Sequence, residues 1–202
     1  MYNQCMSQYF ENDKSIKDNP ETIRFEINGK WYELNSNAGV FSKDKLDTGT
    51  RILLETVLEQ EKDPLSTLDL GCGIGVIGIV LLSNWKTAMT MIDINERAVE
   101  LTKSNLQKYQ LQASVYAQSG IVQDTKFECI LLNPPIRTGK KMIYSLFDQC
   151  VEHLAKDGRF WIVMRKQHGA QSAISYLEEK GCIVERVVRD KGYWIMKIEK
   201  AD

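Results

Sequence analysis

From residue 67 onward, the chain alternates short apolar runs with longer segments of helical periodicity. The pattern predicts strands at Thr67–Leu70, Ala88–Asp93, Ser114–Ala117, Cys129–Leu132, Arg159–Met164, Ile183–Val188 and Tyr193–Ile198, and helices at Val76–Leu82, Glu96–Tyr109, Lys141–Leu154 and Ala170–Glu179. Such alternation specifies a mainly parallel sheet with helices on both faces, joined by right-handed crossovers. The link from Arg189 to Gly192 is too short for a crossover helix, so the last two strands pair antiparallel. We therefore predict a doubly wound α/β fold whose seven-stranded sheet contains one antiparallel strand.

A β-hairpin and a helix are expected before this sheet. The stretch from Thr22 to Leu34 alternates around Asn28-Gly29, and such a pair suits a type I′ turn because both central residues need positive φ. After a glycine-containing link, Leu46 to Glu59 shows helical spacing of its apolar residues. We expect a polar arm at residues 1–21, a hairpin and helix extension at 22–65, and a cofactor-binding domain at 66–202.

Composition narrows the classes of function. With 202 residues, 43% of them hydrophobic, the chain suits one main domain. Five cysteines without a C-x-x-C pair, and only two histidines, predict no metal site. The odd cysteine count, and an N-terminus without a basic-then-apolar leader, predict a cytoplasmic protein, and no apolar run predicts a membrane span. A net charge of −1 means that any RNA partner would bind through a local basic patch.

A glycine-rich loop follows the first strand of the sheet directly. Residues 67–75 read Thr-Leu-Asp-Leu-Gly-Cys-Gly-Ile-Gly and lead into a helix. Glycines lack a Cβ atom, so a ligand can approach their backbone closely, and open α/β sheets bind ligands beyond the carboxyl ends of their strands. Asp93 closes the next strand, where a carboxylate can accept hydrogen bonds from two ribose hydroxyls. The loop and Asp93 together predict a site for a nucleoside-containing cofactor.

The glycines alone do not identify the cofactor. Gly73 to Gly78 also fits the dinucleotide pattern G-x-G-x-x-G, with Asp93 about 20 residues further on. Against a dinucleotide, no second domain follows to supply a hydride acceptor. Asp69, just before the glycines, suits a cofactor with an ammonium group and no phosphate, although an acid here can also cap the loop. Asp93 can alternatively cap the next helix, but Asn95 is better placed for that role.

The motif Asn133-Pro134-Pro135 ends a wholly apolar strand. Neither proline donates a hydrogen bond and each fixes its φ, so the backbone is rigid and its carbonyls are free. The Asn133 side-chain oxygen and the Pro134 carbonyl can accept both N–H bonds of an amino group, which directs its lone pair toward a sulfonium methyl group. The alternative is a simple strand terminator, since Asn-Pro commonly starts a turn. Combined with Asp69 and Asp93, the motif predicts methyl transfer to a planar amine.

These motifs resemble those of class I S-adenosylmethionine-dependent methyltransferases, in particular the small methyltransferase domain family, whose best-known members methylate N2 of guanine in small-subunit ribosomal RNA. The likeness covers Thr22 to Lys200 and includes Gly39-Val40-Phe41-Ser42 and Leu46-Asp47-Thr48-Gly49-Thr50. It implies S-adenosylmethionine as the cofactor. The implied cofactor contacts are Asp69, Gly71, Cys72, Gly73, Gly75, Asp93, Ile94, Ser119 and Asn133; the implied acceptor contacts are Phe41, Ile136, Arg137 and Lys140; and the implied catalytic residues are Asn133, Pro134 and Pro135.

The sequence departs from the family pattern in two places that matter for the site. Ile136 stands where many amine methyltransferases carry an aromatic residue that stacks on the base, and Gln118-Ser119-Gly120 stands where an acidic residue often meets the adenine amine. The chain also lacks the duplicated N-terminal domain of some ribosomal RNA enzymes. Because of these departures, the sequence identifies the methyl acceptor less closely than it identifies the cofactor.

Basic residues follow two of the predicted strands and define a candidate RNA-binding rim. They are Arg137, Lys140, Lys141, Arg165, Lys166 and His168. Such a rim would meet phosphates, and the alternative is an ordinary solvated surface. Ribosomal RNA is the expected partner. A protein glutamine amide, a small-molecule amine, and an inactive nucleotide-binding module for ribosome assembly remain alternative functions.

Overall fold

The computed structural model describes residues 17–41, 45–122 and 124–201. Most of the expected N-terminal arm, and Ser42 of the family motif, therefore lie outside the described residues. The strands are β1 (Glu21–Ile27), β2 (Lys30–Ser36), β3 (Ser66–Leu70), β4 (Ala88–Asp93), β5 (Ser114–Ala117), β6 (Phe127–Leu132), β7 (Leu154–Arg165), β8 (Cys182–Asp190) and β9 (Tyr193–Lys200). The helices are α2 (Thr48–Gln60), α3 (Val76–Leu82), α4 (Glu96–Lys108), α5 (Lys140–His153) and α6 (Ala170–Glu179), with 3₁₀ turns at Ile136–Thr138 and Lys166–His168.

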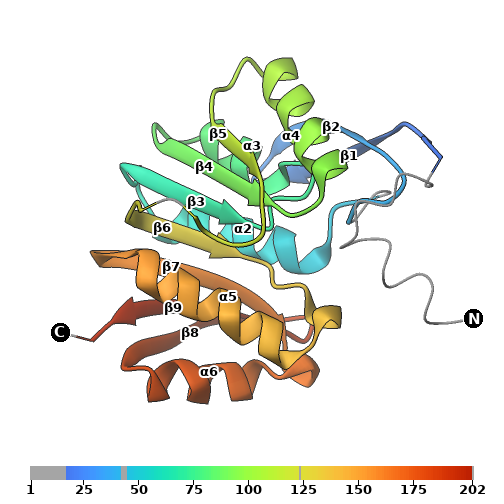
Figure 1. Cartoon of the computed structure of the whole chain (residues 1–202). Helices are drawn as coiled ribbons and strands as arrows, with labels where there is room; N and C mark the ends of the chain where they lie inside the picture. The colour runs from blue at the N-terminus through green and yellow to red at the C-terminus, as the bar shows by residue number, and fades with distance from the viewer. Residues whose placement is uncertain (1–16, 42–44, 123, 202) are drawn as a thin grey trace, which may run out of the picture.

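The main sheet has seven strands in the order β5-β4-β3-β6-β7-β9-β8 (Figure 1). Strand β9 pairs antiparallel with both of its neighbours, while the other pairings are parallel. The predicted doubly wound fold with one antiparallel strand is confirmed. The chain order reverses between β3 and β6, which is where open α/β sheets bind their ligands.

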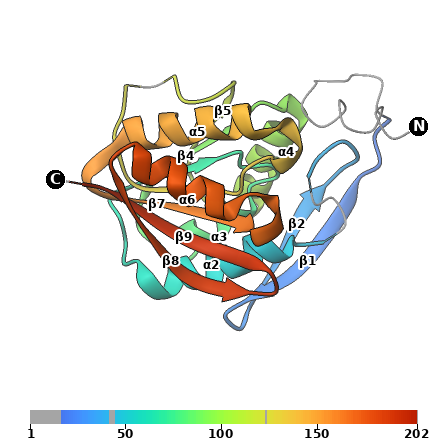
Figure 2. The ribbon, with the colours of Figure 1, turned by 90° about the horizontal axis from the view of Figure 1, so that it is seen from below.

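Helices cover both faces of this sheet, because its strands are apolar on both sides. Helices α2, α3 and α4 and the β1–β2 hairpin contribute to one buried cluster, and α5 and α6 contribute to a second cluster on the opposite face. Figure 2 shows α5 and α6 on one side of the sheet and α2 with the hairpin on the other. No helix among the described residues has the length and apolar character that crossing a bilayer requires.

The β1–β2 hairpin turns at Asn28 and Gly29, whose φ angles are 47° and 79°, as the Asn-Gly pair predicts. The hairpin is joined to the main domain by hydrogen bonds as well as by apolar contacts. The buried Asn105 of α4 accepts a bond from Asn35 N (2.7 Å) and donates to the carbonyls of Asn35 and Ile74 (3.0 Å each). One side chain therefore links the hairpin to the glycine-rich loop.

The largest difference from the predicted elements lies at the start of β7. This strand begins at Leu154, and not at Arg159, because Leu154 already pairs with Phe127. The ladder is irregular between Phe127 and Cys129. The polar residues 156–158 break the apolar pattern, so hydrophobicity alone placed the start of the strand too late.

Candidate active site

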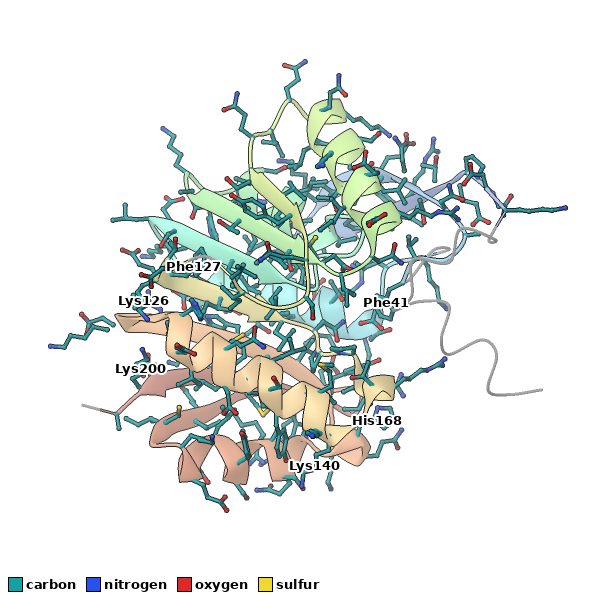
Figure 3. All side chains as sticks on the ribbon, viewed as in Figure 1. Phe41, Lys126, Phe127, Lys140, His168 and Lys200 are labelled. Atoms are coloured by element: carbon teal, nitrogen blue, oxygen red, sulfur yellow. The ribbon has the colours of Figure 1, made fainter. Side chains whose placement is uncertain are left out.

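The residues singled out in the sequence gather at the end of the sheet where β3, β4, β6 and β7 finish. Figure 3 shows Phe41, Lys140 and His168 near this end of the molecule, whereas Lys126, Phe127 and Lys200 lie near the opposite end. The amino end of α2 also reaches this edge, because the buried residues of this helix pack against the sheet. With the end of β5, which Ser119 follows closely, the site is built from five strand ends and one helix start.

The glycine-rich loop turns sharply after β3. Gly71 and Gly73 have φ angles of 77° and 56°, and a Cβ atom added to either would meet no atom within 4 Å. Gly75 differs, because a Cβ there would lie 3.2 Å from the Thr102 side chain of α4. Gly71 and Gly73 therefore border open space that a ligand can fill, whereas Gly75 permits close packing against α4. Cys72, between the first two glycines, is buried.

Asp69 lies fully buried in β3 beneath the loop. Its Oδ2 accepts a hydrogen bond from the backbone N–H of Gly78 in the first turn of α3 (3.2 Å), while its Oδ1 has no partner among the described residues. Burial raises the pKa of this carboxyl to about 7; the Gly78 bond opposes the rise, and the nearby Asp93 adds to it. A buried acceptor without a donor is costly unless a ligand supplies one. An ammonium group would supply it.

Asp93 ends β4 with only 4% of its surface exposed. Its two oxygens accept bonds from Gly73 N and Asn95 N, both at 2.8 Å. Burial raises its pKa, and these backbone donors oppose the rise. Asn95, and not Asp93, caps α4 by accepting a bond from Ala98 N (3.2 Å). Each Asp93 oxygen retains a second lone pair, so this carboxylate can both hold the loop and accept further bonds from a ligand.

The residues after β4 and β5 lie beside Asp93. Ile94 is 39% exposed, which is unusual for an isoleucine directly after a buried strand. Gln118 N donates to the Asp93 carbonyl (2.9 Å), so the exposed Ser119 follows immediately after a contact with β4. Gln149 of α5 fixes the far side of this loop by accepting a bond from Ile121 N (2.8 Å).

Asn133 and the two prolines follow β6 directly, next to the end of β3. Pro134 is buried, and the half-buried Asn133 donates its amide N–H bonds to Asp47 Oδ2 (3.2 Å) and Thr50 Oγ1 (2.9 Å) of the α2 start. The Pro135 carbonyl accepts bonds from Thr138 N (3.0 Å) and Thr138 Oγ1 (2.7 Å). Asn133 Oδ1 and the Pro134 carbonyl accept no bond from the described residues. They are the two acceptors that the sequence analysis selects.

The remaining residues that the sequence predicts to contact the acceptor are Phe41 and three residues that follow this turn in the chain. Ile136 is half-buried, Arg137 and Lys140 are exposed, and Lys140 Nζ lies 5.0 Å from the Tyr144 ring centroid. Phe41 is 46% exposed. A phenylalanine exposed to this extent near the strand ends is available to contact a bound molecule.

Most of the proposed basic rim lies on exposed turns after β6 and β7. Arg137, Lys140, Lys141, Arg165, Lys166 and His168 are all exposed. The Arg165 guanidinium lies 4.7 Å from the Tyr193 ring centroid, and Lys166 N donates to the Gly192 carbonyl (2.9 Å). The β8–β9 turn is therefore adjacent to this rim.

The sequence analysis assigns no role to three residues that the structure brings to the site, namely Asp47, Gly49 and Thr50. They belong to the family motif that precedes and begins α2, so the resemblance contained the signal. Asp47 and Thr50 contact Asn133 across more than 80 positions of sequence, and Gly49 lies between them in the chain; no local pattern reveals these contacts. Among the described residues, no group of three or more potential metal ligands comes together.

A doubly wound sheet with one antiparallel strand, a glycine-rich loop after its first strand and an acidic residue ending the next defines the class I S-adenosylmethionine-dependent methyltransferases. The model of the methyltransferase small domain family matches residues 31–197, and the chain belongs to this family. The cofactor of this family is S-adenosylmethionine. It is not the dinucleotide that the spacing of Gly73 to Gly78 also allows. The open space at Gly71 and Gly73, and the unpaired buried oxygen of Asp69, fit a cofactor that carries an ammonium group.

Three comparisons illustrate this membership. The uncharacterized protein YbxB of Bacillus subtilis is 40% identical over 201 residues, which is 96% of this chain and 100% of that protein. Ribosomal RNA small subunit methyltransferase C of Haemophilus influenzae is 42% identical over 132 residues, or 62% of this chain and 39% of that enzyme. The structure of the Thermus thermophilus 16S rRNA N2 G1207 methyltransferase, in complex with AdoMet and guanosine, superposes with a TM-score of 0.80 at 22% identity.

The coverage of these matches differs. The Thermus thermophilus structure matches 90% of this chain, but this chain matches only 51% of that one. The chain spans about two fifths of the Haemophilus influenzae enzyme and the full length of YbxB. The matched region contains the cofactor loop, Asp93 and the Asn133 motif, because the family model extends from residue 31 to residue 197.

Proposed function

We propose that this protein transfers a methyl group from S-adenosylmethionine to the exocyclic N2 amine of a guanine in small-subunit ribosomal RNA. The observation that carries the proposal is the state of the Asn133 side chain. Its amide nitrogen is occupied by Asp47 and Thr50, and its oxygen is free beside the glycine-rich loop strand. A free, oriented acceptor next to a cofactor loop is what an amine substrate requires.

In this proposal, the ends of β3, β4 and β5 hold the cofactor. Asp93 accepts bonds from the two ribose hydroxyls, Asp69 receives the ammonium group, and Ser119 lies toward the adenine. The other proposed contacts are Gly71, Cys72, Gly73, Gly75, Ile94 and Asn133. When bound, S-adenosylmethionine supplies an electrophilic methyl group on a sulfonium centre. Two buried carboxyl groups near that centre also suit a cationic cofactor.

The acceptor half orients the amine. Asn133 Oδ1 and the Pro134 carbonyl accept its two N–H bonds, and Pro135 keeps the turn rigid through its carbonyl bonds to Thr138. With both N–H bonds held, the nitrogen lone pair projects out of the amine plane toward the methyl group. The new N–C bond forms as the S–C bond breaks, and the amine then loses one proton to water. Asn133 acts only as a hydrogen-bond acceptor, because an amide is not a base at neutral pH.

The acceptor contacts proposed for the nucleotide are Phe41 and Ile136 for the base and Arg137 and Lys140 for phosphates. Arg165 and Lys166 extend this basic rim on the neighbouring strand end. The guanine assignment is supported by the likeness to the Thermus thermophilus 16S rRNA N2 G1207 methyltransferase, whose structure contains guanosine, and by the ribosomal RNA enzymes among the sequence relatives. A protein glutamine amide is the second candidate, because Ile136 lacks the aromatic ring that would stack on a base.

The test is to incubate the purified protein with methyl-labelled S-adenosylmethionine and separated RNA, ribosomal-particle, protein and metabolite fractions. We expect label in small-subunit ribosomal RNA, recovered after digestion as N2-methylguanosine. Asn133→Ala, checked for folding by thermal unfolding, serves as the inactive control. Label recovered only in a protein side-chain amide or in a small molecule would contradict the guanine assignment and leave the family membership unaffected.

A further inference from the structure

The amino end of α2 touches the Asn133 side chain, although the two lie far apart in sequence. Asn133 Nδ2 is 3.2 Å from Asp47 Oδ2 and 2.9 Å from Thr50 Oγ1. The Asn133 amide nitrogen is the donor in both contacts. We call Asp47, Thr50 and Asn133 the amide bracket.

The amide bracket permits only one orientation of the Asn133 amide. A half-turn of the amide would bring its oxygen against the Asp47 carboxylate, which has no hydrogen to donate. The Thr50 hydroxyl could donate to the oxygen in that orientation only by giving up its own bond to Asp47 Oδ2 (3.3 Å). Its lone pairs are left to accept from Asn133. The bracket therefore directs the Asn133 oxygen away from α2.

The partners in the bracket are themselves fixed in place. Asp47 is the N-cap of α2, and its Oδ2 accepts a bond from Thr50 N (2.9 Å). Gly49, between them, packs beneath the ring of Tyr193, where a Cβ atom would lie 2.8 Å from the ring. Thr50 is 5% exposed. A helix cap and a close contact with β9 thus hold the two acceptors in position against Asn133.

We propose that Asp47 and Thr50 are positioning residues of the active site, which orient the Asn133 amide so that its oxygen faces the acceptor. That the Asn133 oxygen faces the methyl acceptor rests on the proposed amine methylation. That Asp47 and Thr50 fix the orientation of the Asn133 amide does not depend on it. Neither residue touches the reacting atoms. Each acts through Asn133, so their loss lowers turnover without weakening cofactor binding.

The test compares two conservative changes at Thr50 with a matched change elsewhere in α2. Thr50→Val keeps the shape of the side chain but removes the acceptor, and Thr50→Ser keeps the hydroxyl. Thr56→Val is the control, because the one bond that the buried Thr56 hydroxyl makes within the described part of the chain is to the Ile52 carbonyl of its own helix (2.7 Å). Thermal unfolding of all three variants separates a loss of folding from a loss of orientation.

The first measurement needs no substrate. The side-chain NH₂ resonances of Asn133, identified by their absence in Asn133→Ala, report whether the amide is held. Hydrogen exchange of these resonances with water should accelerate about fivefold or more in Thr50→Val, because one of two bonds is lost. It should stay near the wild-type rate in Thr50→Ser and Thr56→Val. Unchanged exchange in a folded Thr50→Val protein would overturn the inference.

The second measurement is single-turnover methyl transfer at saturating cofactor. We expect a decrease of about tenfold in Thr50→Val, recovery of most of the rate in Thr50→Ser, and little change in Thr56→Val. Cofactor affinity should stay within about twofold in every variant. If Thr50→Val transferred methyl groups at the wild-type rate, Thr50 would not be a positioning residue, even if the Asn133 amide hydrogens exchanged faster. If the wild type methylates no amine at all, the proposed function fails, and the exchange rates alone decide whether the amide is held.

Discussion

The two halves of the site are built in different ways. In the cofactor half, Asp69 and Asp93 are buried, and their partners are backbone N–H groups of Gly78, Gly73 and Asn95, all within 20 residues of the acids. In the acceptor half, Asn133 is half-buried and its partners are side chains 86 and 83 residues away. Local backbone structure is enough to form the cofactor half of the site, whereas the acceptor half also requires α2 to pack correctly on the sheet.

The largest effect on turnover should come from Asn133. Asn133→Ala removes one of two proposed amine acceptors without opening a core cavity, so turnover at saturating cofactor should fall by about a hundredfold or more. Cofactor affinity should fall far less than turnover, because Asn133 is only one of several proposed cofactor contacts, and thermal stability should change little. Single-turnover rates, calorimetry and thermal unfolding check the three expectations. A wild-type rate would reduce the motif to a strand terminator.

Asn133→Asp distinguishes the role of the Asn133 side-chain oxygen as an acceptor from the role of its nitrogen as a donor. It retains an oxygen for the amine but replaces the donor, and it brings a second carboxylate against Asp47. We expect turnover between that of Asn133→Ala and the wild type. Equal activity of Asn133→Asp and the wild type would show that the donor side of the amide has no influence on methyl transfer.

Asp93→Ala should damage the opposite half. Two hydrogen bonds from ribose to a charged acceptor contribute about 1.5–3 kcal/mol each, so affinity for S-adenosylmethionine should fall by more than tenfold, about two to four orders of magnitude. Because Asp93 also accepts bonds from Gly73 N and Asn95 N, the free energy of unfolding should decrease too. Calorimetry on folded protein measures the affinity. Unchanged affinity would mean that Asp93 acts only within the loop.

A smaller, pH-dependent effect is expected at Asp69. Its folded pKa of about 7 exceeds the ordinary value of 3.8, so the unfolded chain releases this proton first and stability declines as pH rises between these values. If an ammonium group binds this carboxylate, cofactor affinity should rise about fivefold to tenfold from pH 6 to 7.5, as Asp69 ionises. Asp69→Asn should show neither trend. Urea unfolding and calorimetry at several pH values make the comparison, and identical pH profiles for both proteins would refute it.

The smallest effect should come from changes in the basic rim. These changes should alter the salt dependence of RNA binding but not that of cofactor binding. If Arg137, Lys140, Arg165 and Lys166 contact phosphates, RNA affinity should fall as salt rises, while cofactor affinity hardly changes. Replacing these four residues with glutamine should reduce the slope of log affinity against log salt by about three to four units. RNA-binding titrations at several salt concentrations measure that slope. An unaltered slope would assign the four residues to the solvated surface.

The sequence predicted the cofactor half better than the acceptor half. The antiparallel pairing of the last two strands, the Asn28-Gly29 turn and the Asn95 cap follow from local patterns, and the structure confirms them. The amide bracket does not, because the sequence contains no local sign that Thr50 lies against Asn133. The start of β7 at Leu154 was also missed, since backbone pairing there overrides a polar sequence.

The position of β9 has a consequence for folding during synthesis on the ribosome. Strands β3 to β7 can pair with one another as soon as they emerge, but, among the described strands, β8 pairs only with β9. The two strands must therefore join as a hairpin after both have been synthesised. Tyr193, the first residue of β9, then covers Gly49 at the start of α2. A nascent chain thus has both the start of α2 and the glycine-rich loop before Tyr193 is added, so the contact over Gly49, beside the amide bracket, is the last of these to form.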